Sequence, residues 1–410
     1  MPVSWQHLYA ERTEGMRASD IREILKVTAQ PDIISLAGGL PAPELFPVDE
    51  YRRAFEWVLE ADGAQALQYG PSEGYQPLRA LLAQRLSRFG MPCGHDDILV
   101  TNGSQQALDL IGKIFVNPGD AVLVEAPTYL GALQAFNQYQ ASYAIVPMDD
   151  NGMRVDDVER VLARHRSHGP PIKFIYALPN FQNPTGRSMS LERRQQLVDV
   201  ASHFGVPIVE DDPYGELRYE GSALPTLKSL DSESVIYLGT FSKILAPGFR
   251  LGWMLATPEL METLLHGKQP SDLHTGMAQQ MATYEVAKAG FVDQHVERIK
   301  AFYRERRDVM LRSIQEHFLP DARYTRPAGG LFVWVELPRD VDTRELLLDA
   351  IQDKVAFVPG QGFHADGSGT NTMRLNFSNV PPDQLQEGIR RLGHAIQRRL
   401  ERTASISATA

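Results

Sequence analysis

Short runs of apolar and β-branched residues alternate with helical patterns between residues 97 and 256, and this alternation constrains the fold more than any other feature. We expect strands at 98–101, 122–125, 173–176, 207–210, 235–238 and 251–254. Helical patterns fall between most of them, for example at 104–115 and 190–204. Such alternation is typical of an α/β domain with a largely parallel sheet. Ligands on these sheets bind beyond the carboxyl ends of the strands.

The pattern changes after about residue 290, where charged helical stretches at 292–317 and 382–402 flank strand candidates at 331–336 and 372–377. These elements predict a smaller α+β domain, and a chain of 410 residues exceeds the size of one core. We expect an N-terminal arm that packs with the small domain, a large ligand-binding domain, the small domain and a disordered tail. The expected boundaries are 1–45, 46–288, 289–402 and 403–410.

Composition excludes several classes of partner. The formal net charge of −10, with no long basic run, argues against nucleic acid. No apolar run approaches the roughly 20 residues of a membrane span, and the first residues lack the pattern of a signal peptide. Cys93 is the single cysteine, which excludes an intrachain disulfide framework and a cysteine-built zinc site. A cytoplasmic location fits these facts.

Lys243 is the first candidate for chemistry. It follows the strand candidate 235–238 and lies in a turn between Ser242 and a Pro-Gly pair, with Arg250 a few residues later. A lysine in such surroundings suits a Schiff base beside a bound phosphate. The alternative is an ordinary solvated lysine.

A helix is expected to begin near Gly103, Ser104 and Gln105, directly after a strand. Free N–H groups at a helix start, together with the Ser104 hydroxyl, form an anion site. Thr240 and Arg250, on either side of Lys243, would add a hydroxyl and a cation to the same phosphate. The alternative is a plain helix with Ser104 as its N-cap.

Asp211 and Asp212 end another buried strand candidate, and carboxylates there are costly unless a cation pairs with them. A protonated pyridine nitrogen would be such a partner for Asp211. A metal site or a helix cap is the alternative, although no second cluster of acidic or histidine ligands supports a metal.

Three further residues follow strand ends. Asn183 lies in the turn segment 179–186, whose composition alone indicates only a turn. With Tyr214, its amide would hydrogen-bond a phenolic oxygen. Tyr129 offers an aromatic face for stacking.

Together these segments resemble the fold-type I family of pyridoxal-phosphate enzymes, specifically the class I/II aminotransferases. Asn183-Pro184-Thr185-Gly186, Asp211-Asp212-Pro213-Tyr214 and the segment from Ser242-Lys243 to Arg250 occur in the family's order and approximate spacing. The resemblance covers almost the whole chain. It implies a large domain with a mostly parallel seven-stranded sheet sandwiched by helices, and a smaller α+β domain formed by the N- and C-terminal segments.

The resemblance also implies roles for individual residues. Lys243 would form the Schiff base and move the proton, Asp211 would keep the pyridine nitrogen charged, and Asn183 and Tyr214 would bind the ring oxygen. Arg374 would bind the substrate α-carboxylate through its guanidinium fork; its alternative is a surface strand arginine. The residues implied in cofactor binding are Gly103, Ser104, Gln105, Tyr129, Asn183, Asp211, Tyr214, Thr240, Ser242, Lys243, Arg250 and Tyr69, the last reaching the partner subunit's phosphate in a homodimer.

Within the family, segments such as 34–41 and 103–108 are most similar to the 2-aminoadipate and kynurenine aminotransferases, especially bacterial lysine-biosynthetic ones. This similarity implies substrate binding by Arg374, Asn183, Gly39, Arg22 and Tyr69. Arg22, on an expected N-terminal helix, would meet a side-chain carboxylate; alternatively it pairs with Asp20 or Glu23 as a solvated arginine.

The implied reaction is a ping-pong transfer of an amino group from an L-amino acid to a 2-oxo acid such as 2-oxoglutarate. The implied donors are of the 2-aminoadipate, aromatic, branched-chain or glutamate type. One rival is a β-lyase on the same fold. Another is an aminotransferase-like domain of a transcription regulator, for which a winged-helix segment would have to precede the match.

Overall fold

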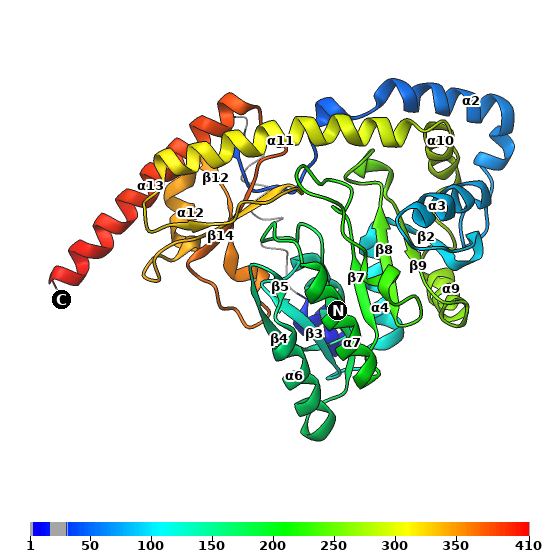
Figure 1. The fold of residues 1–410 in the computed structure, drawn as a ribbon, viewed down its shortest axis with the longest axis horizontal. Coiled ribbons are helices and arrows are strands. Elements are labelled where there is room, and N and C mark those ends of the chain that lie inside the picture. Colours follow the sequence, from blue (N-terminus) through cyan, green and yellow to red (C-terminus); the bar gives the residue numbers. More distant parts are fainter. Residues whose placement is uncertain (1–2, 17–29, 31, 410) are drawn as a thin grey trace.

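The computed structural model describes residues 3–16, 30 and 32–409, with side chains as far as residue 402. An eight-stranded sheet forms its centre (Figure 1). Its strands, in spatial order, are β2 (Ile98–Asn102), β9 (Leu251–Leu255), β8 (Val235–Thr240), β7 (Ile208–Asp211), β6 (Ile172–Ala177), β3 (Ala121–Ala126), β4 (Ser142–Asp149) and β5 (Gly152–Met153).

The sheet is largely parallel, as predicted. The pairs β3–β4, β3–β6, β6–β7 and β7–β8 are parallel, whereas β9 runs antiparallel to both β2 and β8. All six predicted strands form, and the α/β fold class is confirmed. The sheet has eight strands instead of seven because the two-residue β5 folds back on β4. Strand β4 was not predicted: most of its side chains are only half-buried, so it lacks a continuous apolar run.

Helices cover both faces of this sheet. Alternate side chains of a strand point to opposite faces: Val122 and Val124 of β3 join one apolar cluster and Leu123 joins another. The first cluster packs under α4 (Gly103–Phe115), α5 (Leu130–Asn137) and α9 (Pro258–Asp272). The second packs under α6 (Val155–His168), α7 (Leu191–Phe204) and the short α8 (Leu227–Leu230). Burial on both faces explains why the central strands are almost entirely apolar.

A second sheet has four antiparallel strands in the order β10 (Arg323–Tyr324), β11 (Phe332–Glu336), β14 (Thr372–Asn376) and β13 (Val358–Pro359). Three helices lie beside this sheet (Figure 1): α11 (Phe291–His317), α12 (Thr343–Gln352) and α13 (Pro382–Thr409). Helix α11 extends from α13 toward α10 (Met277–Ala287), so it spans both sheets (Figure 1). Helix α13 includes most of 403–410, where we expected a disordered tail.

Part of the N-terminal segment lies with the C-terminal region. Strand β1 (Ile34–Ser35) pairs in parallel with β12 (Val355–Ala356). Beyond this pair, the Leu36 carbonyl accepts a 2.8 Å hydrogen bond from the Asn376 amide. These bonds lead the chain to Gly39, whose carbonyl accepts a hydrogen bond from Lys243, just after β8 of the large sheet. The domain boundaries themselves stay a prediction.

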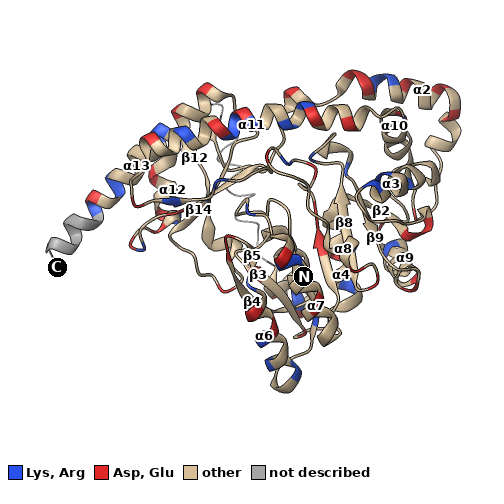
Figure 2. Cartoon of the chain, viewed as in Figure 1, with Lys and Arg blue, Asp and Glu red and all other residues tan. Residues whose placement is uncertain are grey.

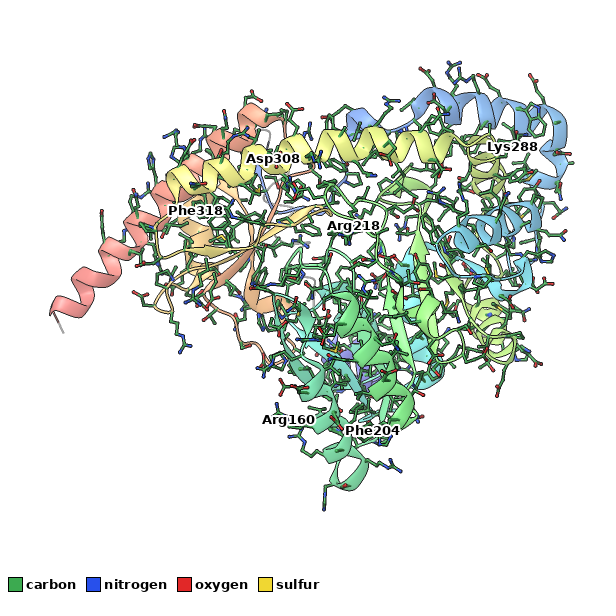
Figure 3. The ribbon with its side chains drawn as sticks, in the orientation of Figure 1. Arg160, Phe204, Arg218, Lys288, Asp308 and Phe318 are labelled. Atoms are coloured by element: carbon green, nitrogen blue, oxygen red, sulfur yellow. The ribbon has the colours of Figure 1, made fainter. Side chains whose placement is uncertain are left out.

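Helices α2 (Val48–Ala66) and α3 (Gln76–Arg88) pack against α10 at the other end of the molecule. Lys288, labelled in Figure 3, lies over the ring of Trp57 at 4.7 Å and links the end of α10 to α2. Charged residues of both signs lie along α2, α11 and α13, whereas the strands of the large sheet carry few (Figure 2). None of the described helices is long and apolar enough to cross a membrane.

Candidate active site

A cavity of about 440 Å³ lies at the carboxyl ends of the parallel strands. Twelve predicted site residues line it, although they come from segments far apart in the sequence. They are Gly39, Ser104, Gln105, Tyr129, Asn183, Asp211, Tyr214, Thr240, Ser242, Lys243, Arg250 and Arg374. These side chains therefore do gather beyond the carboxyl ends of the strands, where the sequence predicted a ligand site.

Lys243 lies just after β8, and its Nζ donates a 2.8 Å hydrogen bond to the Gly39 carbonyl. Burial, together with the charges of Arg374 and Arg250, lowers the pKa of Lys243 to about 8. A substantial fraction of this amine is therefore neutral near pH 7 to 8, and only a neutral amine can act as a nucleophile.

Asp211 ends β7 and is 2% exposed. Its Oδ2 accepts a 2.8 Å hydrogen bond from the hydroxyl of Tyr176, whereas Oδ1 is buried and has no partner among the described residues. Burial raises the pKa of Asp211 to about 7, and the charge of Asp212 adds to this effect. A buried oxygen without a partner is costly, so Oδ1 is suited to a cationic donor that enters the cavity.

Arg374, on β14, points into the same cavity and is 2% exposed. Its Nη1 donates to Asn183 Oδ1 at 2.9 Å and its Nη2 to the Ala37 carbonyl at 2.7 Å. Burial lowers the pKa of Arg374 to about 10, which leaves it charged at neutral pH. Since a guanidinium has five N–H donors and Nε has no partner among the described residues, donors remain for a carboxylate.

Tyr214 and Asn183 form a polar edge beside this arginine. Burial raises the pKa of Tyr214 above its ordinary value, while a hydrogen bond with Asn183 opposes the shift. The Tyr214 ring packs edge-on against the Phe332 ring, with the ring centroids 5.8 Å apart. The phenol therefore stays protonated and can donate to an oxygen in the cavity.

The part of the cavity around the start of α4 and Arg250 has the features of an anion site. Helix α4 begins at Gly103, whose φ is +71°, and a Cβ there would lie 2.5 Å from Nη2 of Arg250. Glycine thus permits the guanidinium to approach the helix start. Nearby, the Ser242 amide donates to Thr240 Oγ1 at 3.1 Å, and the two hydroxyls lie 2.9 Å apart. A helix N-terminus, hydroxyls and an arginine suit a phosphate.

Tyr129 immediately precedes α5 and lines the cavity. Burial, followed by the charge of Asp211, raises the pKa of its hydroxyl. Gln105 donates to the Gly131 carbonyl at 2.9 Å, so it fixes the start of α5 relative to α4. These contacts hold the aromatic ring at the cavity wall.

Three predicted residues are not part of this wall. Gly103 lies at the start of α4, beside Arg250. Tyr69 is 77% exposed, and its nearest aromatic neighbour is His274, with ring centroids 5.9 Å apart. Arg22 lies outside the described residues, so its predicted contact with substrate stays a prediction.

Sequence reasoning missed several residues at or behind the cavity. Gln134, Leu178, Pro213, Leu40 and Pro247 line it. Tyr176, one layer behind, was assigned only to a strand. Its place beside Asp211 follows from the pairing of β6 with β7, which the sequence pattern does not indicate.

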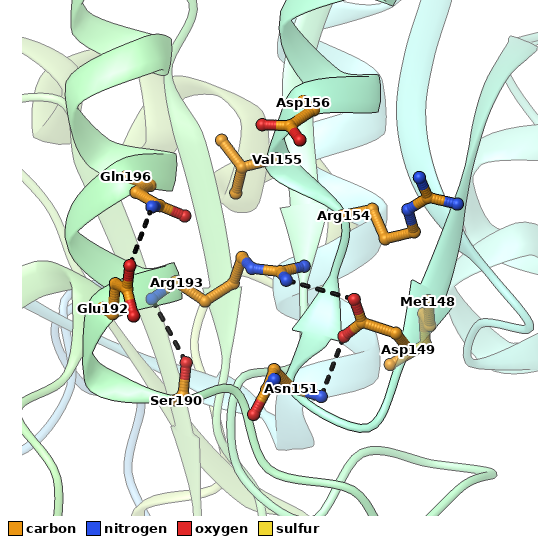
Figure 4. Close-up of a pocket in the computed structure, with 10 residues that line it drawn as sticks. All are labelled: Met148, Asp149, Asn151, Arg154, Val155, Asp156, Ser190, Glu192, Arg193 and Gln196. Atoms are coloured by element: carbon orange, nitrogen blue, oxygen red, sulfur yellow. Dashed lines mark hydrogen bonds and ion pairs between the residues drawn. The ribbon is translucent and has the colours of Figure 1, made fainter.

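A second cavity lies between the starts of α6 and α7 and contains none of the predicted residues (Figure 4). Within it, Arg193 pairs with Asp149 at 3.1 Å, and Asp149 also accepts from the Asn151 amide at 2.8 Å. These charges satisfy one another, so this cavity offers no comparable chemistry. The described residues contain no cluster of three metal-ligating side chains.

Comparisons with known proteins agree with this geometry. The sequence model of the family "Aminotransferase class I and II" matches residues 31–392. The aromatic-amino-acid aminotransferase 1 of Thermococcus litoralis is 47% identical, covering 98% of this chain and 96% of the relative. The 2-aminoadipate transaminase of Thermus thermophilus is 43% identical, covering 97% and 98%.

A solved structure gives the same result. The alpha-aminoadipate aminotransferase from Thermus thermophilus, complexed with N-(5'-phosphopyridoxyl)-L-leucine, is 42% identical with a TM-score of 0.91. The alignment covers 97% of this chain and 100% of that one. These relatives do not favour the β-lyase or regulator alternatives. The chain belongs to the class I and II aminotransferase family and is a transaminase.

Proposed function

We propose that this transaminase uses pyridoxal 5′-phosphate, held by the residues of the cavity, to move the amino group of an L-amino acid to a 2-oxo acid such as 2-oxoglutarate. The observation that carries the proposal is the charge of the cavity wall. Lys243, Arg250 and Arg374 face a single carboxylate, Asp211, whose Oδ1 is free. This set fits a ligand with a phosphate, a carboxylate and one cationic nitrogen.

Different residues of the cavity are proposed to bind different parts of the cofactor. Ser104, Gln105, Thr240, Ser242 and Arg250, with the start of α4 at Gly103, hold the phosphate. Asp211 Oδ1 pairs with the ring nitrogen and keeps it protonated, since a carboxylate favours a nearby positive charge. Tyr129 packs on the ring face, and Asn183 and Tyr214 hold the ring oxygen.

The cofactor, when bound, supplies an electron sink for the substrate α-carbon. Arg374 orients the substrate by its α-carboxylate and so brings the α-hydrogen near Lys243. Lys243 Nζ, with its lowered pKa, would accept that proton and deliver it to the cofactor carbon that keeps the amino group, so that the α-carbon can leave as the carbonyl carbon of a 2-oxo acid. The reaction runs in two halves because one cavity serves the donor and the acceptor in turn.

The substrate range is also proposed. Gly39 and Leu40 lie at the cavity next to Lys243, and Leu40 is half-exposed. We expect aromatic, branched-chain, glutamate and 2-aminoadipate side chains to point toward this mouth. Arg22 is proposed to meet those that carry a second carboxylate.

A homodimer completes the proposal. Leu67 and Tyr69 are 78% and 77% exposed, and Leu273, next to His274, is 54% exposed. Three large side chains exposed close to one another suit a surface that a second copy covers. Tyr69 is proposed to reach the partner's cofactor phosphate.

The test is to follow the visible absorption of the purified holoenzyme while 2-aminoadipate, glutamate, leucine, phenylalanine or kynurenine is added without an acceptor. Loss of the yellow colour, and its return with 2-oxoglutarate, is the expected result. Lys243→Ala should abolish multiple turnover, and Asp211→Asn should reduce catalysis severely while cofactor stays bound. A yellow protein that no amino acid bleaches, or a Lys243→Ala variant with normal turnover, contradicts the proposal.

A further inference from the structure

Tyr176 is the side-chain hydrogen-bond partner of Asp211 among the described residues. It lies on β6, beside β7, and its hydroxyl donates to Asp211 Oδ2 at 2.8 Å. Tyr176 is 0% exposed, and its ring packs edge-on against Phe136 at 5.8 Å. A phenol fixed in this way has one orientation, so it fixes the plane of the carboxylate and leaves Oδ1 as the free oxygen.

The proton of this hydrogen bond belongs to Tyr176. Burial and the charge of Asp211 raise the pKa of Tyr176 well above its ordinary value, so the phenol donates and does not ionise. Asp211, with a pKa raised to about 7, is balanced between its two states near neutral pH. A single hydrogen bond to the charged form is therefore large enough to decide which state dominates.

Other groups around Asp211 raise or lower its pKa. The titratable and charged groups near it are Asp212 directly after β7, Tyr129 before α5, Tyr214 after β7, and Lys243, Arg250 and Arg374 on the cavity wall. Asp212 raises the pKa of Asp211, whereas the Tyr176 hydrogen bond lowers it. Tyr176 is thus the neighbour that opposes both burial and Asp212 through a direct contact.

We propose that Tyr176 is a positioning residue that acts through Asp211: its hydroxyl holds Oδ2, keeps the carboxylate ionised and presents Oδ1 to the ring nitrogen of the cofactor. This inference rests on the proposed function, because it assigns the partner of Oδ1. Tyr176 itself does not line the cavity.

The first measurement uses apoenzyme, so that it does not depend on turnover. The infrared difference between wild type and Asp211→Asn, recorded as a function of pH, isolates the carbonyl band of protonated Asp211. In a Tyr176→Phe background the midpoint should rise by about one to two pH units, as expected for loss of one buried hydrogen bond to a charged group. Pyridoxal phosphate should bind about 10-fold or more weakly to Tyr176→Phe at pH 7.

Tyr237→Phe is the matched control. Tyr237 is also buried, and its hydroxyl donates to Asp212 Oδ2 at 3.2 Å, so this variant removes the same group from the neighbouring carboxylate. Its Asp211 midpoint should not rise, because the Tyr176–Asp211 bond is intact and protonation of Asp212 would remove a repulsive charge.

Replacing Tyr176 with 3-fluorotyrosine keeps the shape of the side chain, strengthens the donor and should move the midpoint in the opposite direction. This variant also covers the case in which Tyr176→Phe does not fold. An unchanged Asp211 midpoint in both Tyr176 variants, or an equal rise in Tyr237→Phe, overturns the inference. If wild-type holoenzyme fails to transaminate any donor, the proposed function fails instead, and the apoenzyme titration is unaffected by that outcome.

Discussion

The side-chain oxygen of Asn183 accepts a 2.9 Å hydrogen bond from Nη1 of Arg374, and this bond joins the two sheets of the molecule across the cavity. Asn183 follows β6 of the large sheet, whereas Arg374 belongs to β14 of the small one. The same guanidinium donates to the Ala37 carbonyl of the N-terminal segment. Three distant parts of the chain thus position one cation.

Arg374→Lys should therefore impair recognition of the α-carboxylate. Lysine keeps the positive charge but lacks the guanidinium fork, so we expect kcat/KM for amino acids to fall about 10- to 100-fold, mainly through KM. Steady-state kinetics checks this result. The corresponding amine without a carboxylate is the control substrate, and an equal loss for both substrates would show that the change disturbs the cavity generally.

The lowered pKa of Lys243 predicts unusual reactivity in the apoenzyme. Since the pKa is lowered to about 8, the neutral amine predominates above that pH. The rate at which Lys243 captures a small aldehyde without a phosphate should rise with pH and level off with a midpoint near 8. Stopped-flow absorbance measures it, with Lys243→Ala as the blank. A rate that still climbs at about pH 10 would mean that the lysine has its ordinary pKa.

Most of this site could be predicted from sequence because its residues follow strand ends, and parallel strands bring those ends together. Asp211, Asn183 and Lys243 each come soon after a short apolar run. Tyr176 was missed because a tyrosine inside an apolar strand is typical of a core, and its hydrogen bond with Asp211 depends on strand order. That order, with β7 between β6 and β8, results from crossovers that periodicity does not encode.

The prediction was weaker at the margins of the fold. Strand β4 was not predicted because its side chains are mostly half-buried and include Pro147, so the segment lacks the apolar pattern of a buried strand. The eighth strand is two residues long and exists through its pairing with β4. The role of Tyr69 is implied by family resemblance alone and stays a prediction, since nothing local to an exposed tyrosine marks it as part of a site.

His295 predicts how stability depends on pH. The side chain is buried on α11, neither ring nitrogen has a partner among the described residues, and the ring stacks on Phe291 at 5.1 Å. Burial, followed by the charge of Arg298, lowers its pKa, so the folded protein holds it neutral. The unfolded chain takes up a proton below about pH 6.5, and the free energy of unfolding therefore decreases as pH falls.

His295→Leu should remove this component. Between about pH 6.5 and 5, the free energy of unfolding should then change less steeply with pH, by up to about 1.4 kcal/mol per pH unit. Urea unfolding at several pH values measures it, with His168→Leu on the exposed end of α6 as the control. Identical slopes for His295→Leu and wild type would show that His295 takes up its proton equally in the folded and unfolded states.

Tyr69 provides the sharpest test of the dimer, because its side chain is 77% exposed in one chain and lies outside that chain's cavity. If it serves the partner's cofactor, Tyr69→Ala and Lys243→Ala homodimers should both be nearly inactive. In a mixed dimer, one site contains the intact Lys243 of the first subunit and the intact Tyr69 of the second. Unfolding and refolding an equimolar mixture should therefore restore about a quarter of wild-type activity, since about half of the dimers are mixed and each has one complete site.

Refolding each variant alone is the control, and sedimentation velocity verifies that the mixture is dimeric. No recovery in a verified mixed dimer would place Tyr69 with the cavity of its own chain, whereas a fully active Tyr69→Ala homodimer would place it outside any site. Recovery well below a quarter, with normal dimerisation, would indicate that Tyr69→Ala also damages the subunit that carries it. The restored fraction thus measures whether the exposed position of Tyr69 reflects a contribution to a site in the second subunit.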